Sequence, residues 1–291
     1  MKWNLGAGSD NQTIILLDVQ CGTCYIFPML IFLKLGGSLI TDKTRPYTAR
    51  PKRLDDLVQQ IASALKEDAS LRLVLGHGSG SFGHIPASQH NTRQGVGSPE
   101  AWRGFSEVWY QASGLNRLVI EAIHRTGLPA VTLSPAASVT AHDGKPFIWD
   151  VYQLQSALDN GLLPVIHGDV VFDDLRGGTI LSTEDLFSHL ARILHPGRIL
   201  LAGLEAGVWE DFPERRKLLA EITPGTFSGK IPGPGSADGT DVTGGMQSKV
   251  SEMLELVGQV EDLEVLIFSG EEKDAIRNAL LGASPGTRVH R

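Results

Sequence analysis

Short apolar runs alternate with amphipathic stretches over most of the chain. The runs are rich in Leu, Ile and Val with little polar alternation, which is typical of strands covered on both faces. They predict strands at Leu30–Leu35, Leu71–Leu75, Ala130–Leu133, Leu162–Ile166, Arg198–Ala202 and Glu264–Phe268. The stretches between them predict helices at Leu54–Lys66, Trp102–Arg125, Val151–Asn160, Ser182–Leu194, Met246–Val257 and Glu272–Leu281. This order predicts an α/β fold with a mostly parallel sheet between layers of helices.

Two segments interrupt the alternation, and the first 28 residues stand outside it. Val170–Leu181 has short apolar pieces around Asp-Asp-Leu-Arg-Gly-Gly, which predicts a hairpin. Ser228–Gly245 is crowded with Gly and Pro, which predicts a mobile loop before the next helix. Met29 stands just before the first strand, so we interpret residues 1–28 as an N-terminal extension or a misplaced start.

Composition narrows the class of protein. The 291 residues are 42% hydrophobic, which is enough for a sizeable core. A formal net charge of −7 argues against nucleic-acid binding, although a local Lys and Gly cluster can still bind a small anion. Cys21 and Cys24 have no further metal ligands nearby, and Ile14–Leu33 is too interrupted by polar residues and Pro for a membrane span. We therefore expect a soluble, cytoplasmic protein.

The end of the first strand is the first candidate phosphate site. Lys34 is followed by Gly36, Gly37 and Ser38, and Lys43 comes a few residues later. Glycines directly after a strand let backbone N–H groups approach an anion, and a lysine there adds positive charge. The alternative is a plain tight turn with a solvated lysine.

The second strand runs into Gly-His-Gly-Ser-Gly-Ser-Phe-Gly-His, residues 76–84, which contains the Gly-x-Gly-x-x-Gly of a dinucleotide-binding turn. That interpretation requires a helix immediately after the third glycine and an acidic residue at the end of the next strand. Neither is expected here, because Ile85-Pro86 and a polar stretch follow and Glu100 opens a helix. We therefore favour a phosphate loop in which His84 donates to a phosphoryl oxygen.

Further candidates follow at the ends of later strands. His167-Gly168-Asp169 follows the predicted strand Leu162–Ile166, at the edge where parallel sheets bind ligands. Ser182-Thr183-Glu184-Asp185 fits an ordinary helix N-cap, and it also offers a carboxylate that could orient lysines. Residues 241–249 bring Gly244 and Gly245 to a helix start with Lys249 one turn in, a suitable arrangement for a phosphate and a transfer cation.

Four motifs in this order resemble the amino acid kinase superfamily and, within it, the isopentenyl phosphate kinases. They are Leu-Lys-Leu-Gly-Gly-Ser-Leu-Ile-Thr-Asp-Lys from Leu33, His-Gly-Ser-Gly-Ser-Phe-Gly-His from His77, His-Gly-Asp-Val-Val-Phe-Asp from His167, and Asp-Val-Thr-Gly-Gly-Met-Gln-Ser-Lys from Asp241. The resemblance implies a three-layer αβα sandwich over residues 29–291, with an N-terminal acceptor-binding part and a C-terminal nucleotide-binding part. It also implies a homodimer that uses ATP and Mg²⁺ to convert isopentenyl phosphate into isopentenyl diphosphate.

The resemblance also implies a role for each matching residue. Lys34 and Lys249 match the lysines that stabilise the transferring phosphoryl group, Lys43 a further cation, and His84 the contact to the acceptor phosphate. Backbone positions lining the acceptor site match Gly78, Gly83 and Gly168. Positions that hold the ATP phosphates or lie near the nucleotide match Gly36, Gly37, Ser38, Ser79, Gly207, Gly244 and Gly245.

The chain departs from the family pattern at two places. The usual Ser-Gly-Asp is Ser182-Thr183-Glu184, so the acidic role passes to Glu184, with Asp185 as the second choice. The usual Thr-Asp-Val-Asp-Gly-Val-Tyr is residues 203–209 here, and both aspartates are missing. No metal-ligating residue is assigned.

The chemistry of the candidate residues agrees with a phosphate acceptor. Such an acceptor is already an anionic nucleophile, so the site needs cations and N–H donors and does not need a strong base. Phe105, Val108, Trp109, Ala112, Ile148 and Tyr152 either line a slot for a short isoprenoid tail or belong to the core. The alternatives are a kinase for another small phosphate or phosphonate such as fosfomycin, a non-catalytic nucleotide-binding regulator, and a redox enzyme, which the loop disfavours.

Overall fold

A computed structural model describes residues 29–227 and 245–291. Its main sheet has eight strands in the order β12-β14-β13-β9-β1-β2-β6-β3. These strands are β1 Leu30–Leu35, β2 Arg72–His77, β3 Ala130–Thr132, β6 Leu163–His167, β9 Arg198–Gly203, β12 Glu221–Ile222, β13 Glu264–Ser269 and β14 Thr287–Val289. All neighbours pair in parallel except β13 and β14. The predicted parallel sheet is confirmed.

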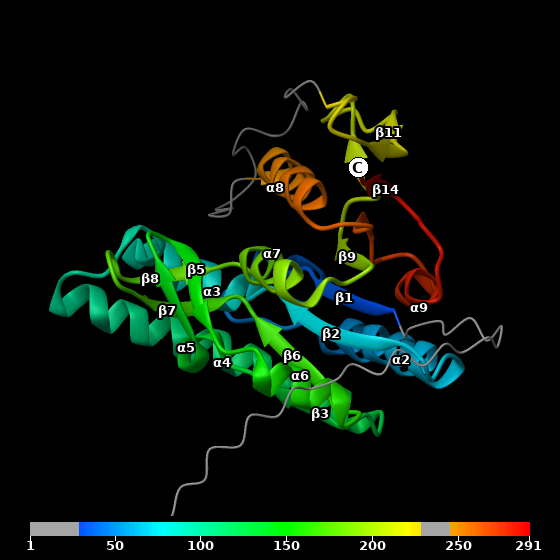
Figure 1. Cartoon of the computed structure of the whole chain (residues 1–291). Helices are drawn as coiled ribbons and strands as arrows, with labels where there is room; N and C mark the ends of the chain where they lie inside the picture. Colours follow the sequence, from blue (N-terminus) through cyan, green and yellow to red (C-terminus); the bar gives the residue numbers. More distant parts are fainter. Residues whose placement is uncertain (1–28, 228–244) are drawn as a thin grey trace, which may run out of the picture.

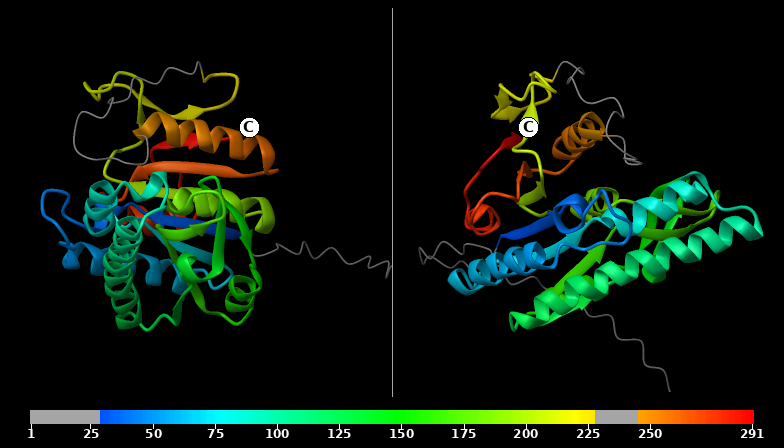
Figure 2. Two further views of the ribbon diagram at one scale, coloured as in Figure 1. Left: turned by 90° about the vertical axis from the view of Figure 1, so that its left-hand side faces the viewer. Right: turned by 180° about the vertical axis from the view of Figure 1, so that it is seen from behind.

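Helices cover both faces of this sheet, as Figures 1 and 2 show. They are α1 Gly37–Ile40, α2 Pro51–Glu67, α3 Gly80–His90, α4 Pro99–Arg125, α5 Pro135–Ser138, α6 Tyr152–Asp159, α7 Thr183–Leu194, α8 Gly245–Gln259 and α9 Ala275–Leu280, with a 3₁₀ turn η1 at Thr92–Gln94. One core packs α2, α4 and α9 against residues such as Ile31 and Leu33 of β1. The other core packs α7 and α8 against the opposite face, where Phe32 points. The three-layer αβα sandwich is therefore confirmed.

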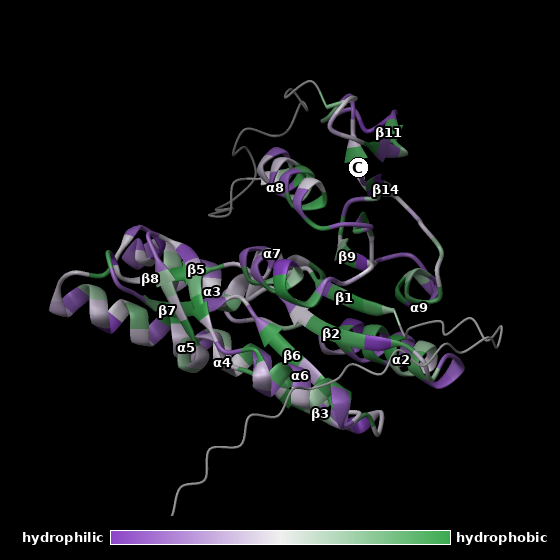
Figure 3. Cartoon of the chain, in the orientation of Figure 1, coloured by the Kyte–Doolittle hydropathy of each residue, from purple (hydrophilic) through white to green (hydrophobic). Residues whose placement is uncertain are grey.

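The strand predictions succeed because the central strands are apolar on both sides. Leu30–Leu35 is buried along nearly its whole length, and the hydrophobic colour in Figure 3 runs along β1 and β2. All six predicted strands and all six predicted helices are present, with ends shifted by at most three residues. No helix in the described part of the chain is both long and apolar enough to cross a bilayer.

A second sheet stands beside the first, with the strand order β5-β4-β7-β8. β7 Asp169–Asp173 and β8 Gly177–Leu181 form the predicted hairpin, while β4 Val139–His142 and β5 Lys145–Trp149 form a hairpin that we did not predict. Two more short strands, β10 Val208–Trp209 and β11 Leu218–Leu219, pair with each other near the C-terminus (Figure 1). Asp143 and Gly144 join β4 to β5, both with positive φ, which is a recognisable two-residue hairpin turn.

Three sequence predictions fall outside the described residues. They are the interpretation of residues 1–28 as an N-terminal extension, the interpretation of Cys21 and Cys24 within it, and most of the Gly- and Pro-rich segment 228–245. Gly245 is the first described residue after that segment and begins α8.

Candidate active site

The loops that follow β1, β2 and β6 are tied together at the carboxyl edge of the sheet. The Gly36 N–H donates to Ala202 O at 2.8 Å, and the Gly78 N–H donates to Leu35 O at 3.0 Å. The Gly168 N–H donates to His77 O at 3.1 Å. Each of these N–H groups fixes its loop to the end of a neighbouring strand, so Gly78 and Gly168 can line an acceptor site with their backbone but do not aim their N–H groups into it.

The first two loops pack backbone against backbone. A Cβ atom on Gly37 would lie 2.4 Å from the Gly80 N, which is closer than side-chain atoms come to backbone. Gly80 also has a φ of +49°, a value that favours glycine. Any larger residue at either position would push the two candidate phosphate loops apart, so the sequence of small residues is required by this contact.

The expectation that no helix follows the second loop is wrong. Helix α3 begins at Gly80, inside the glycine-rich segment, and includes Gly83, His84 and Pro86. The composition hides this helix, because Gly and Pro are the poorest helix formers and no apolar stripe runs along it. The dinucleotide interpretation therefore loses one of the arguments made against it. The other argument stands, since Glu100 lies in the first turn of α4 and ends no strand.

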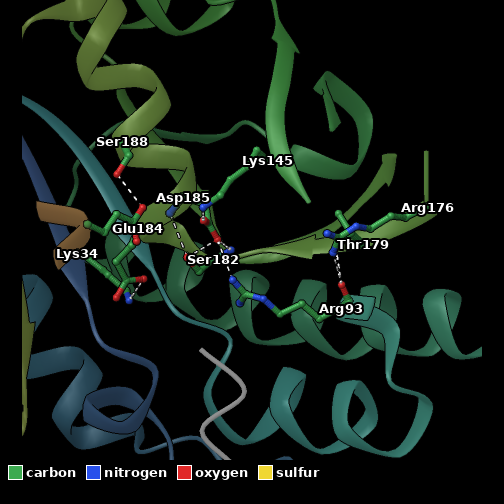
Figure 4. Close-up of polar contacts among 10 residues, drawn as sticks. Lys34, Arg93, Lys145, Arg176, Thr179, Ser182, Glu184, Asp185 and Ser188 are labelled. Carbon is green, nitrogen blue, oxygen red and sulfur yellow. Dashed lines mark hydrogen bonds and ion pairs between the residues drawn. The ribbon is translucent and has the colours of Figure 1, made fainter. Parts of the chain in front are cut away.

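Two lysines from distant parts of the chain meet one buried carboxylate. Lys34 of β1 forms an ion pair with Glu184 Oε2, and the Lys249 Nζ of α8 lies 3.6 Å from Glu184 Oε1. The Glu184 side chain is 6% exposed and the Lys34 side chain 11%. Figure 4 shows Lys34 and Glu184 pointing toward each other. The structure thus brings together three of the residues to which the sequence assigned phosphoryl transfer.

The ionisation of Glu184 follows from this arrangement. Burial by itself would raise the pKa of the carboxyl, but the charges of Lys34 and Lys249 outweigh burial and lower the pKa to about 2. Glu184 is therefore an anion at neutral pH and holds two ammonium groups close together. The start of α7 is also anchored to the β2 loop, because Thr183 Oγ1 donates to His77 O at 2.7 Å.

Asp185, the second choice for the acidic role, has a different set of contacts. It completes a capping box with Ser182 at the start of α7, accepting from the Ser182 N–H at 2.9 Å. Its other partners are Arg93 at 3.3 Å and Lys145 at 3.4 Å (Figure 4). These contacts tie the helix end to the 3₁₀ turn η1 and to the start of β5. Glu184 is accordingly the acid that faces the lysines.

Glu252 is a nearby acid that the sequence analysis did not single out. It lies one turn after Lys249 on α8 and accepts a hydrogen bond from Ser188 Oγ at 3.0 Å. Burial and the negative charge of Asp185 raise its pKa. The spacing from Lys249 was the only available signal, since the packing of α8 against α7 creates this environment.

The other predicted site residues lie around this centre. Ser38 and the exposed Lys43 line a cavity of about 260 Å³ together with Arg50 and Leu204. His84 is half-buried in the first turns of α3, and Gly83 is buried beside it. A Cβ on Gly207 would lie 2.5 Å from Thr287 Oγ1. Close packing against β14 is therefore sufficient to explain the glycine at this position, without any contact to a nucleotide. Gly244 lies outside the described residues.

The candidates for a tail slot divide into two groups. Phe105, Val108 and Ala112 are buried, and the first two pack in a small core with Val170. Trp109 is 44% exposed and lines a cavity of about 310 Å³ whose wall also includes Asn116 and His167. Ile148 and Tyr152 lie mostly on the surface. Trp109 is thus the predicted slot residue that faces an open space.

Fold and site together define a class of kinase, and comparisons with known proteins agree. Residues 29–269 match the amino acid kinase family, and the chain belongs to that family. Within it, the chain is 33% identical to the isopentenyl phosphate kinase of Methanothermobacter thermautotrophicus, over 89% of this chain and 98% of that protein. The corresponding enzyme of Methanocaldococcus jannaschii is 30% identical, over 90% and 98% of the two chains. A solved isopentenyl phosphate kinase structure superposes with a TM-score of 0.75 and 31% identity, covering 89% of this chain and 99% of that one.

Proposed function

We propose that this chain transfers the γ-phosphoryl group of ATP to isopentenyl phosphate and forms isopentenyl diphosphate. The observation that supports this most directly is the Lys34–Glu184–Lys249 cluster at the carboxyl edge of the sheet. Two ammonium groups held by one buried carboxylate are suited to a transferring phosphoryl group, which spreads negative charge over its oxygens. The isopentenyl phosphate kinases among its relatives support the identity of the acceptor.

The residues of the site would divide the work as follows. An oxygen of the acceptor phosphate attacks the γ-phosphorus, the bond to the β-phosphate oxygen breaks, and ADP leaves. Lys34 and Lys249 neutralise the charge on the transferring group, with Lys43 as a further cation, and His84 donates to the acceptor phosphate. Backbone of Gly78, Gly83 and Gly168 would line the acceptor site. The ATP phosphates would lie along Gly36, Gly37, Ser38, Ser79, Gly244 and Gly245, with Gly207 near the nucleotide.

Mg²⁺ fits this scheme as an ion that arrives with the nucleotide. Among the described residues, no group of three or more His, Cys, Asp or Glu side chains is placed to hold a metal. Mg²⁺ commonly binds through substrate phosphates and one or two carboxylates. Glu184 is already neutralised by two lysines, so we infer that the phosphates of ATP would supply most of the ligands and that Mg²⁺ would offset their charge.

We also propose a cytoplasmic homodimer. Tyr110 and Leu118 leave apolar surface exposed on α4, at 68% and 38% of their maximal areas. A second copy of the chain packed on this helix would cover them. Sedimentation of the wild type and of Tyr110→Glu would test this, since a dimer held by that face should dissociate in the variant.

The decisive test is an ATP-dependent phosphorylation assay with three acceptors. Isopentenyl phosphate, dimethylallyl phosphate and fosfomycin should be compared at equal concentration, with the product identified by ³¹P NMR. We expect diphosphate formation from isopentenyl phosphate with the largest kcat/KM. Preference for fosfomycin would favour the phosphonate kinase, and failure with every acceptor despite ATP binding would favour a nucleotide-binding regulator.

A further inference from the structure

Two buried histidines stand directly before the glycines of the candidate acceptor site. His77 ends β2 and His167 ends β6, and the two residues are register neighbours in the parallel pair. Their rings stack with centroids 5.4 Å apart and planes 8° from parallel. They are 0% and 1% exposed. The proposed mechanism uses neither side chain, so their position needs an explanation of its own.

His77 is held on both of its ring nitrogens. Its Nδ1 lies 3.1 Å from the carbonyl oxygen of Gly78, and its Nε2 lies 3.1 Å from Asn116 Oδ1. Asn116 Nδ2 lies 2.9 Å from Thr132 Oγ1, which in turn lies 3.3 Å from Val165 O. Burial, followed by the neighbouring His167, lowers the pKa of His77 to about 4. The imidazole is therefore neutral at physiological pH and carries a single N–H.

A neutral imidazole carries one N–H and here faces two oxygens, so both contacts are hydrogen bonds only if the Asn116 amide is rotated by 180°. Nδ1–H then donates to the Gly78 carbonyl, the Asn116 NH₂ donates to Nε2, and the Thr132 hydroxyl donates to the amide oxygen in place of Val165 O. The other tautomer would place the lone pair of Nδ1 against the Gly78 oxygen, which is repulsive. His77 thus donates to the carbonyl of the peptide that joins Gly78 to Ser79.

We propose that His77 is a positioning residue that aims the Ser79 N–H at a nucleotide phosphate. A trans peptide is planar, so its carbonyl and its N–H point in opposite directions. Because the Gly78 carbonyl points at the imidazole, the Ser79 N–H points away from it. That N–H donates to no group in residues 29–227 or 245–291. The proposal rests on the proposed function only in taking the anion to be a phosphate of ATP.

A pair of substitutions separates the hydrogen bond from the packing of the ring. His77→Asn keeps an N–H donor near the position of Nδ1, while His77→Gln moves the donor outward to the position of Nε2. His77→Phe keeps the ring and removes the donor. A hydrogen bond to a charged group corresponds to roughly a 10- to 100-fold change in binding or rate. We expect kcat/KM for ATP to fall by about that factor in His77→Gln and His77→Phe, to recover in His77→Asn, and KM for the acceptor to stay constant.

The direct readout is the amide resonance of Ser79 in ¹⁵N-serine-labelled protein, identified by its loss in Ser79→Ala. Mg·ADP should shift it downfield in the wild type and in His77→Asn, and much less in His77→Gln. His124→Phe is the matched control, because His124 makes a similar 3.1 Å contact to the carbonyl of Ala130 far from the loops.

Two results would overturn the proposal: equal kinetics in His77→Asn and His77→Gln, or a wild-type Ser79 resonance that ignores Mg·ADP. The comparison of Asn with Gln remains informative if His77→Phe does not fold. A His77-dependent response to Mg·ADP without transfer to isopentenyl phosphate would refute the proposed acceptor and still support the role of His77.

Discussion

Replacing Glu184 with Gln tests the central ion-pair cluster. The substitution keeps the size of the side chain and removes the charge that holds Lys34 and Lys249. The pKa of Glu184 lies at about 2, against an ordinary value of 4.5. At about 1.4 kcal/mol per pKa unit, this difference corresponds to roughly 3 kcal/mol of folding free energy at neutral pH. A similar figure, about 3–5 kcal/mol, is usual when one partner of a buried ion pair is removed.

The pH dependence of the free energy of unfolding shows whether the ionised carboxylate is what stabilises the fold. A depressed carboxyl pKa stabilises the fold fully above the unfolded value of 4.5, and this contribution is lost as the pH falls toward the folded value of about 2. The stability difference between wild type and Glu184→Gln should therefore be roughly 3 kcal/mol at pH 7 and about half of that at pH 3.

Urea unfolding of both proteins across this pH range measures the difference. Glu272→Gln is the control, because Glu272 is exposed and its substitution should change stability by less than about 0.5 kcal/mol. A difference that is absent at pH 7, or that stays constant down to pH 3, would show that the lysines do not stabilise the ionised carboxyl.

Four further predictions concern the loops, the acceptor and the core. Gly37→Ala should lower kcat by more than about 10-fold, because its methyl group must displace the Gly80 backbone by several tenths of an ångström; wild-type kcat would show that the loop spacing is unimportant. His84→Ala should lower turnover of the acceptor by orders of magnitude while calorimetry finds ATP binding largely intact, and normal turnover would remove His84 from the mechanism. Trp109→Ala should change the preference among prenyl phosphates of different length without unfolding the protein. Phe105→Ala should instead destabilise the core by about 3–5 kcal/mol, as thermal unfolding would show.

The sequence predicted the central strands well because strands buried on both faces carry an apolar residue at every position. It missed α3 because Gly80, Gly83 and Pro86 oppose helix formation locally, and tertiary packing overrides them. The β4–β5 hairpin had a usable signal in Asp143-Gly144, because both residues have the positive φ of a two-residue hairpin turn. Local sequence patterns thus predict an element correctly where the helix or strand propensity of its residues agrees with their burial in the fold.

The candidate site was predictable only in part. Loop composition indicated where phosphate could bind, and the N-cap pattern of α7 placed an acid near a strand end. The family resemblance named Glu184 first and Asp185 second, and the ion pairs of Lys34 and Lys249 with Glu184 agree with that order. The environment of Glu252 likewise arises from residues more than 60 positions apart in sequence, at Ser188 and Asp185. Such pairings follow from topology, which single-residue patterns do not encode.

The buried carboxylate between the two lysines also affects which anions the site retains. Glu184 leaves Lys34 and Lys249 with a combined charge of one unit, so a monovalent ion such as chloride gains little by entering. A polyphosphate can contact both ammonium groups with separate oxygens and gains from each of them. Monovalent salts should therefore compete poorly with the nucleotide, and inhibition by added chloride should be weak compared with inhibition by pyrophosphate.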